Sequence, residues 1–182
     1  MTRATVSAAA PADREILRAR ARELARTPAP EPASGALLEV LEFGLARERY
    51  AVETRCVAEV HPLKHLTPLP CTPAFVLGVV NLRGRILPVY DIRKLFDLPQ
   101  QGLTDLHRII VVHGGDLEIG LLAEAIEGVR SVPLESLQAS LPTLTGIRAD
   151  YLKGVTAEHL VVLDLDRILA DPRIVVEQRV ED

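Results

Sequence analysis

The spacing of apolar residues changes near residue 35. Over residues 12–26, Ile, Leu and Ala recur at helical intervals among residues of high helix propensity, which predicts a helix. Three prolines follow, namely Pro28, Pro30 and Pro32. Because proline lacks an amide hydrogen and disfavours helix at the preceding residue, residues 27–35 are predicted to form an extended linker. We therefore expect an N-terminal helical arm, residues 1–35, that is separate from a body at residues 36–175.

Beyond residue 35 the apolar residues alternate with polar ones, and this period of two predicts β-strands. Three pairs of such segments flank short turns, which predicts hairpins. In two of the turns, a glycine readily adopts the positive φ that a tight turn needs. The turns are expected at residues 47–49, at Arg83-Gly84 and at Gly114-Gly115. Four prolines, Pro62, Pro68, Pro70 and Pro73, predict irregular chain between the first two hairpins.

One pattern of apolar and polar positions occurs twice. Residues 88–96 and 161–169 match in polarity at nearly every position, and each is typical of a buried strand that runs into a short helix. Asp91 and Asp164 stand where the strand pattern ends. A carboxylate oxygen at this point can accept a hydrogen bond from a free amide of the first helical turn. We therefore interpret both aspartates as helix caps.

Chance similarity within a β-rich chain is one explanation of the repeat, and duplication is the explanation that we favour. Duplication predicts two small β-barrel-like halves, roughly residues 36–95 and 96–170, whose apolar faces meet in a shared core. Short antiparallel strands close on themselves in this way because closure removes open sheet edges.

Composition and charge narrow the function classes. The chain has no Trp, three Phe and three Tyr, so its core must consist of Val, Leu and Ile, which favours β structure. Residues 1–35 carry a net charge of +2 and the remaining residues a net charge of −6. An acidic body with few aromatic residues lacks the basic surface and the stacking platforms of a nucleic-acid binder, so we expect no nucleic-acid partner.

The sequence has no apolar run of membrane-spanning length and no leader pattern at its N-terminus, which predicts a cytoplasmic protein without direct membrane insertion. Cys56 and Cys71 lack CxxC spacing and are expected to be reduced thiols.

No catalytic residue, cofactor or metal site is predicted. His61 and His65 are spaced for metal binding on a helix, but Pro62 lies between them and no third ligand is near. Gly114-Gly115 lacks the Lys-Ser/Thr of a phosphate-binding loop. Capping explains Asp91 and Asp164 without a catalytic role, which leaves Asp166 without a carboxylate partner for acid–base chemistry. These patterns favour a binding module over an enzyme.

Residues 38–170 resemble the CheW family of chemotaxis coupling proteins. The resemblance depends on residues 57–60, 72–84 and 86–93, and the run from Gly78 to Asp91 is its most specific part. It implies a mainly β fold of two SH3-like five-stranded β-barrel subdomains that share a hydrophobic core. It also implies a non-enzymatic adaptor that couples methyl-accepting chemoreceptor tips to the regulatory CheW-like domain of the histidine kinase CheA.

The resemblance also implies roles for individual residues. Receptor binding is expected at Glu59, Asn81 and Arg83. Kinase binding is expected at Leu41, Thr54 and Val57. Alternation alone does not show which face each strand residue occupies, so Leu41 and Val57 are equally consistent with the core. A solvated strand position is the alternative for Glu59, and a turn cation that aids solubility is the alternative for Arg83, but the resemblance favours receptor binding for both.

The arm departs from the shortest family members. Four arginines recur every four residues along its predicted helix, namely Arg14, Arg18, Arg22 and Arg26. This basic ridge predicts either a solvated face or a docking surface for the acidic body or another protein. The arm leaves a second function open, that of a CheW-like adaptor in a non-flagellar pathway for second-messenger or surface-motility control. A small β-barrel nucleic-acid-binding module is the least favoured alternative.

Overall fold

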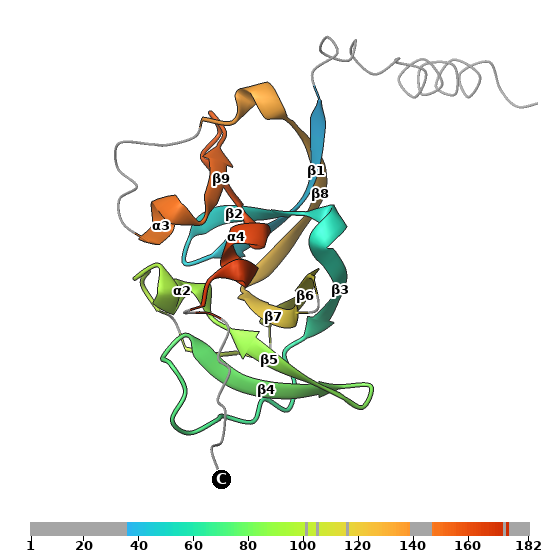
Figure 1. The fold of residues 1–182 in the computed structure, drawn as a ribbon, viewed down its shortest axis with the longest axis vertical. Helices are drawn as coiled ribbons and strands as arrows, with labels where there is room; N and C mark the ends of the chain where they lie inside the picture. Colours follow the sequence, from blue (N-terminus) through green and yellow to red (C-terminus); the bar gives the residue numbers. More distant parts are fainter. Residues whose placement is uncertain are drawn as a thin grey trace, which may run out of the picture. The chain divides into compact units, whose positions relative to one another are not determined.

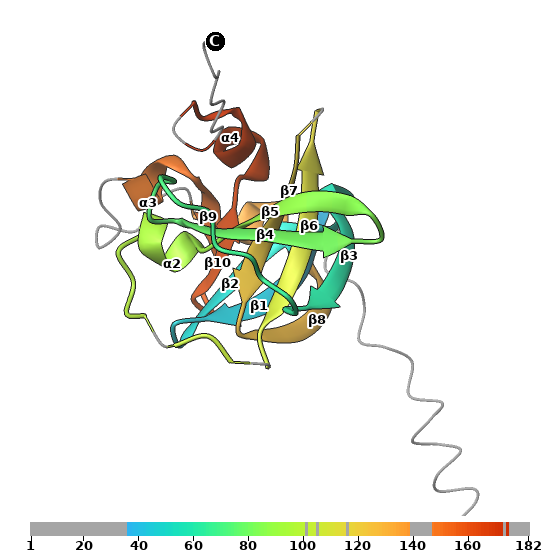
Figure 2. The ribbon, with the colours of Figure 1, turned by 90° about the horizontal axis from the view of Figure 1, so that it is seen from below.

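The computed structural model describes residues 36–100, 102–104, 106–115, 117–138, 147–172 and 174. The predicted helix at 12–26 and linker at 27–35 lie outside these residues. Within the described part, ten strands form two five-stranded sheets, shown from two directions in Figures 1 and 2. The fold is therefore mainly β, as predicted.

The first sheet has the strand order β8-β1-β2-β10-β9. Its strands are β1 (Leu37–Leu45), β2 (Glu48–Glu53), β8 (Ala125–Pro133), β9 (Leu152–Val155) and β10 (Leu160–Leu163). We call this sheet A. The second, sheet B, has the order β3-β6-β7-β5-β4. Its strands are β3 (Val57–Pro62), β4 (Val76–Leu82), β5 (Arg85–Tyr90), β6 (Arg108–Gly114) and β7 (Leu117–Ala123).

Short helical segments connect the strands. They are η1 (Thr54–Cys56), α2 (Ile92–Leu95), η2 (Leu134–Ser136), α3 (Ile147–Asp150) and α4 (Leu165–Ala170). Helices α2 and α4 form the C-terminal ends of the two copies of the repeated pattern, as predicted. Asp91 Oδ1 accepts a hydrogen bond from Arg93 N at 3.0 Å, and Asp164 Oδ1 accepts one from Arg167 N at 3.1 Å. Both predicted caps are confirmed.

The three predicted hairpins are confirmed as β1-β2, β4-β5 and β6-β7. The predicted division into sequential halves at residues 36–95 and 96–170 is wrong, because β1 and β2 pair with strands from the C-terminal part of the chain. Local alternation predicts the strands of the three hairpins but carries no information about a strand's distant partner.

The two sheets nevertheless have the same arrangement. In sheet B, β7 pairs with β6 in a hairpin and with β5 in parallel, and β5 pairs with β4. In sheet A, β2 pairs with β1 in a hairpin and with β10 in parallel, and β10 pairs with β9. The order β3 to β7 thus corresponds to β8, β9, β10, β1 and β2, which is a circular permutation and agrees with duplication.

One hydrophobic core cluster contains residues of both sheets, as expected, and each sheet also has a smaller cluster of its own. Buried side chains of both sheets belong to one cluster, among them Phe43 and Tyr50 of sheet A and Ile110 and Leu121 of sheet B. The Phe43 and Tyr50 rings stack with centroids 6.1 Å apart. Burying such side chains gives roughly 1.5–3 kcal/mol each, so the shared core stabilises both sheets together.

The proline-rich stretch before β4 is irregular, as predicted, yet it is fixed to that strand. Thr67 and Val79 exchange two backbone hydrogen bonds of 2.8 Å. Gly78 has φ 143°, and a Cβ added there would lie 2.2 Å from Thr67 O. Glycine is therefore required where this stretch pairs with β4.

No helix in the described part of the chain has the length and apolar character needed to cross a membrane.

Candidate partner-binding surface

The turn between β4 and β5 has a defined backbone. Arg83 and Gly84 both have positive φ, 53° and 87°, as in the two-residue turns that match the twist of a hairpin. Asn81 Oδ1 accepts a hydrogen bond from Gly84 N at 2.8 Å. Asn81 therefore stabilises the turn through its side chain. The Arg83 side chain at the tip of this turn is 74% exposed.

Glu59 of β3 lies beside this turn. Its Oε2 atom is 2.9 Å from His61 Nε2 and 3.2 Å from Arg83 Nη1, and its Oε1 atom is 3.5 Å from Arg85 Nη2. Arg85 Nη1 also donates to Glu118 Oε2 at 2.6 Å. We call these five residues the tip cluster.

The tip cluster joins opposite edges of sheet B. Strands β3 and β4 are the two edge strands, yet Glu59 of β3 contacts Arg83 at the end of β4. The sheet must curl for this contact to form, and Figure 2 shows the β4-β5 turn beside β3. The structure thus brings together the three predicted receptor-binding residues, Glu59, Asn81 and Arg83.

Glu59 is ionised over the physiological range. The hydrogen bond from His61 lowers the pKa of Glu59 most, partial desolvation opposes this shift, and the charges of Arg83 and Arg85 lower the pKa further. The ion pair with Arg83 is solvent-exposed, and such pairs contribute only about 0–1 kcal/mol to stability. Arg83 can therefore leave Glu59 for another partner at little cost.

The three predicted kinase-binding residues lie in different environments. Leu41 is 6% exposed and belongs to the shared core, so its prediction as a surface contact is corrected. Val57 is partly buried and packs against the same core. Thr54 is partly exposed on η1, where its Oγ1 donates to Glu39 O at 3.2 Å. Thr54 is thus the first residue of η1, and Val57 is the first residue of β3.

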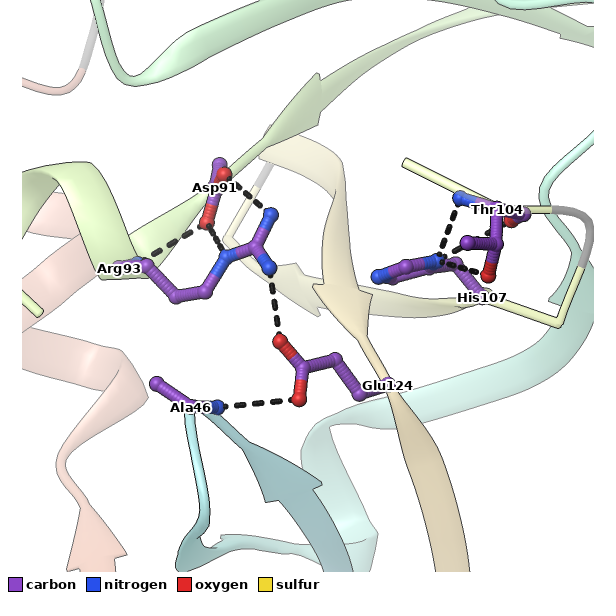
Figure 3. Close-up of polar contacts among 6 residues, drawn as sticks. All are labelled: Ala46, Asp91, Arg93, Thr104, His107 and Glu124. Carbon is purple, nitrogen blue, oxygen red and sulfur yellow. Dashed lines mark hydrogen bonds and ion pairs between the residues drawn. The ribbon is translucent and has the colours of Figure 1, made fainter. Parts of the chain in front are cut away.

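A buried network lies between the sheets (Figure 3). Arg93 donates to both carboxylate oxygens of Asp91 at 2.9 and 2.8 Å, and its Nη1 atom donates to Glu124 Oε1 at 2.7 Å. Glu124 Oε2 accepts a hydrogen bond from Ala46 N, at the β1-β2 turn, at 3.2 Å. The side chains of Arg93 and Asp91 are 2% and 1% exposed. This network holds sheet B to a turn of sheet A.

Figure 3 also shows a structural histidine at the start of β6. His107 is buried, and its Nδ1 atom accepts a hydrogen bond from Thr104 N at 3.0 Å. Nδ1 also lies 3.0 Å from Thr104 Oγ1 and 3.1 Å from Thr104 O, so contacts with one residue hold the ring in place.

Sequence reasoning missed His61, Arg85 and Glu118 of the tip cluster. Alternation places Arg85 and Glu118 in strands, but it does not show that β5 and β7 bring them within contact. Among the described residues, no group of three or more His, Cys, Asp or Glu side chains is arranged to hold a metal ion.

The fold and the exposed hairpin tip define a small two-sheet β module for binding other proteins. A model of the CheW-like domain matches residues 39–173, so the chain belongs to the CheW family. It is 29% identical over 143 residues to the chemotaxis protein CheW of Treponema pallidum, across 75% of this chain and 84% of the relative.

Two further similarities extend this assignment. The chain is 30% identical over 137 residues to protein FrzA of Myxococcus xanthus, across 72% of this chain and 84% of the relative. The crystal structure of the scaffolding protein TtCheW from Thermoanaerobacter tengcongensis matches with a TM-score of 0.64 and 28% identity, over 76% of this chain and 91% of that chain. The solved fold therefore agrees with the two-sheet arrangement described above.

Proposed function

We propose that this protein is a non-enzymatic adaptor that couples methyl-accepting chemoreceptors to a CheA-type histidine kinase in chemotaxis. Membership of the CheW family supports this role. The ion pair of Glu59 and Arg83 supports the receptor-binding part of this role, because it places an exposed arginine on a turn that a hydrogen bond holds in shape. The adaptor acts in the cytoplasm, where partners recruit it to membrane-associated receptor arrays.

The receptor site comprises Glu59, Asn81 and Arg83. Arg83 offers planar N–H donors to an acidic group of the receptor tip. Glu59 keeps its contacts with His61 and Arg85 when Arg83 leaves it, and its carboxylate can accept a hydrogen bond from the receptor in place of Arg83. Asn81 keeps the turn in shape for both contacts. An arginine that is mostly exposed loses little stability when it changes partner, and this property suits a reversible interface.

The kinase site comprises Thr54 and Val57. Thr54 is partly exposed on η1, and Val57 begins β3 with part of its side chain at the surface. Asn81 and Arg83 lie on a different segment, at the β4-β5 turn, whereas Glu59 of the receptor site is two residues beyond Val57 on β3. The two proposed sites therefore adjoin each other, and the adaptor role requires that both partners fit there together.

A second candidate function is the same adaptor role in a non-flagellar chemosensory pathway. Similarity to protein FrzA, which does not carry the CheW name, favours keeping this candidate. Affinity capture from native lysate, followed by mass spectrometry of the kinase and receptors, separates the two pathways.

The direct test is assembly of a ternary complex. The full chain is mixed with a purified receptor signalling tip and with the kinase regulatory domain, singly and together, and complexes are separated by size-exclusion chromatography. We expect both binary complexes and one complex with all three proteins. Mutually exclusive binding of the receptor and the kinase would contradict the adaptor role.

A further inference from the structure

The two sheets carry an ion pair at the same point of their shared arrangement, with the charges exchanged. In sheet B, Val89 of β5 pairs with Gly120 of β7. In sheet A, Val162 of β10, the counterpart of Val89, pairs with Ala51 of β2. The two parallel pairs give a common register for comparing positions.

Four residues beyond each of these positions lies a charged side chain. In sheet B they are Arg93 and Glu124, and in sheet A they are Asp166 and Arg55. Arg93 Nη1 is 2.7 Å from Glu124 Oε1, and Arg55 Nη2 is 2.7 Å from Asp166 Oδ2. Both sheets therefore have an arginine–carboxylate pair at this position. The arginine follows β5 in sheet B, but in sheet A it follows β2, the counterpart of β7.

The reversal changes what each pair can do. Glu124 accepts a hydrogen bond from Ala46 N, so the β1-β2 turn covers the Arg93 pair. A guanidinium has no acceptor, so Arg55 cannot hold a turn amide in this way. The side chains of Arg93 and Glu124 are 2% and 23% exposed, whereas those of Arg55 and Asp166 are 58% and 60% exposed.

Arg55 is nevertheless held in one orientation. Its Nε atom donates to Glu53 Oε2 at 2.6 Å, and Nη2 donates to Glu53 and Asp166. Burial alone would raise the pKa of Glu53, but hydrogen bonds from Arg55 and Lys153 outweigh it and lower the pKa. Among the described residues, no hydrogen bond or ion pair engages Nη1 of Arg55. An oriented guanidinium with free donors is suited to bind a carboxylate.

We propose that Arg55 is a specificity-determining residue of the kinase contact and donates from Nη1 to a carboxylate of the kinase regulatory domain. This inference rests on the proposed function, because Arg55 lies between Thr54 and Val57 of the proposed kinase site. Asp166 binds the same guanidinium through Nη2, so its negative charge opposes the approach of the partner carboxylate. A partner without an acidic group at this point gains nothing from Nη1, and Arg55 thereby selects between partners.

The test compares the two halves of one ion pair. Kinase regulatory-domain binding is measured by titration calorimetry for Arg55→Gln and Asp166→Asn, with thermal melts of both variants. We expect Arg55→Gln to weaken binding on the order of thirtyfold, and Asp166→Asn to leave binding unchanged or tighter. Arg55→Gln also removes the hydrogen bonds to Glu53, so the thermal melts decide whether a loss of binding is structural. A large fall in the melting temperature of Arg55→Gln together with weaker binding would overturn the proposal. Equal weakening of binding by the two substitutions would overturn it as well.

Two control variants show which part of the proposal is wrong if Arg55→Gln binds the kinase domain normally. Arg85→Gln removes another arginine that is 56% exposed and paired with two carboxylates, and it should leave kinase binding unchanged. Thr54→Arg places bulk in the proposed kinase site. If Thr54→Arg weakens kinase binding and Arg55→Gln does not, Arg55 has no role and the kinase site stands. If neither changes kinase binding, the kinase site and the role of Arg55 both fail.

Discussion

Glu59 and Arg83 come from opposite edges of one sheet and meet through atoms 3.2 Å apart. Two properties of this turn determine how its contact behaves. The backbone is fixed by the hydrogen bond of Asn81 to Gly84, whereas the ion pair itself is exposed and weak. A fixed turn with an exchangeable side-chain contact is the basis of the first two predictions.

Arg83→Glu should weaken receptor binding while kinase binding and stability change little. Loss of an interface arginine costs on the order of 2 kcal/mol, roughly thirtyfold in affinity, whereas exposed substitutions usually change stability by about 0.5 kcal/mol. Binding to a receptor tip and to the kinase regulatory domain is measured separately by calorimetry.

Arg47→Glu is the matched control for this substitution. Arg47 is also an exposed turn arginine with positive φ, 68° against 53° at Arg83, but it belongs to the β1-β2 turn. Equal loss of both partners by the Arg83 variant, or a large fall in its melting temperature, would show that Arg83 supports structure instead.

The titration of Glu59 should report the tip cluster directly. Its folded-state pKa is lowered from 4.5, first by the hydrogen bond from His61 and then by Arg83 and Arg85. A carboxylate with a lowered pKa stabilises the folded state above its unfolded pKa, and this contribution is lost as pH falls through the folded value. Carbon-13 NMR titration should therefore place the Glu59 pKa below 4.5. His61→Ala should raise this pKa more than Arg83→Gln does, and the reverse order would contradict the contacts described here.

Local features of the fold could be predicted from sequence, and features that depend on distant partners could not. The caps at Asp91 and Asp164 follow from a strand pattern that ends at an acidic residue. The placement of β1 and β2 in sheet A depends on pairing with β8 and β10, which no local pattern records. The circular permutation of the repeat is consequently visible only in the strand order.

The binding surface likewise has features that could be predicted from the sequence and features that could not. Asn81 and Arg83 are two residues apart in one hairpin, and the family resemblance predicts that they share a receptor contact with Glu59. Alternation does not identify the buried face of a strand, so the sequence leaves Leu41 open between a kinase contact and the core, and the structure places it in the core. Arg93 gave no signal of burial, since a charged side chain is ordinarily exposed unless it is paired.

Deletion of residues 1–34 should leave the body folded. The described core cluster begins at Leu41 and is closed by contacts between residues of the two sheets. The chain divides between Ser34 and Gly35, which is where the deletion ends. Thermal unfolding followed by circular dichroism should remain cooperative with a similar midpoint. Loss of cooperativity in the shortened chain would show that the deleted segment completes the core.

Removal of the Arg93 charge should destabilise the protein far more than removal of its counterpart in sheet A. Arg93→Met leaves the carboxylate of Asp91, whose side chain is 1% exposed, without its guanidinium partner. Breaking one side of such a buried pair typically costs about 3–5 kcal/mol, because an uncompensated charge stays buried. Asp166→Asn breaks the equivalent exposed pair, which is worth about 0–1 kcal/mol.

Chemical denaturation with urea gives both free energies of unfolding on one scale. We expect the midpoint of Arg93→Met to fall steeply and that of Asp166→Asn to stay near the original. A double variant, Asp91→Asn with Arg93→Met, removes the stranded carboxylate and should recover part of the loss. Since Glu124 would still lack its cation, the recovery should be incomplete. Equal stability of the single and double variants would mean that Arg93 stabilises the fold through its packing and not through its charge.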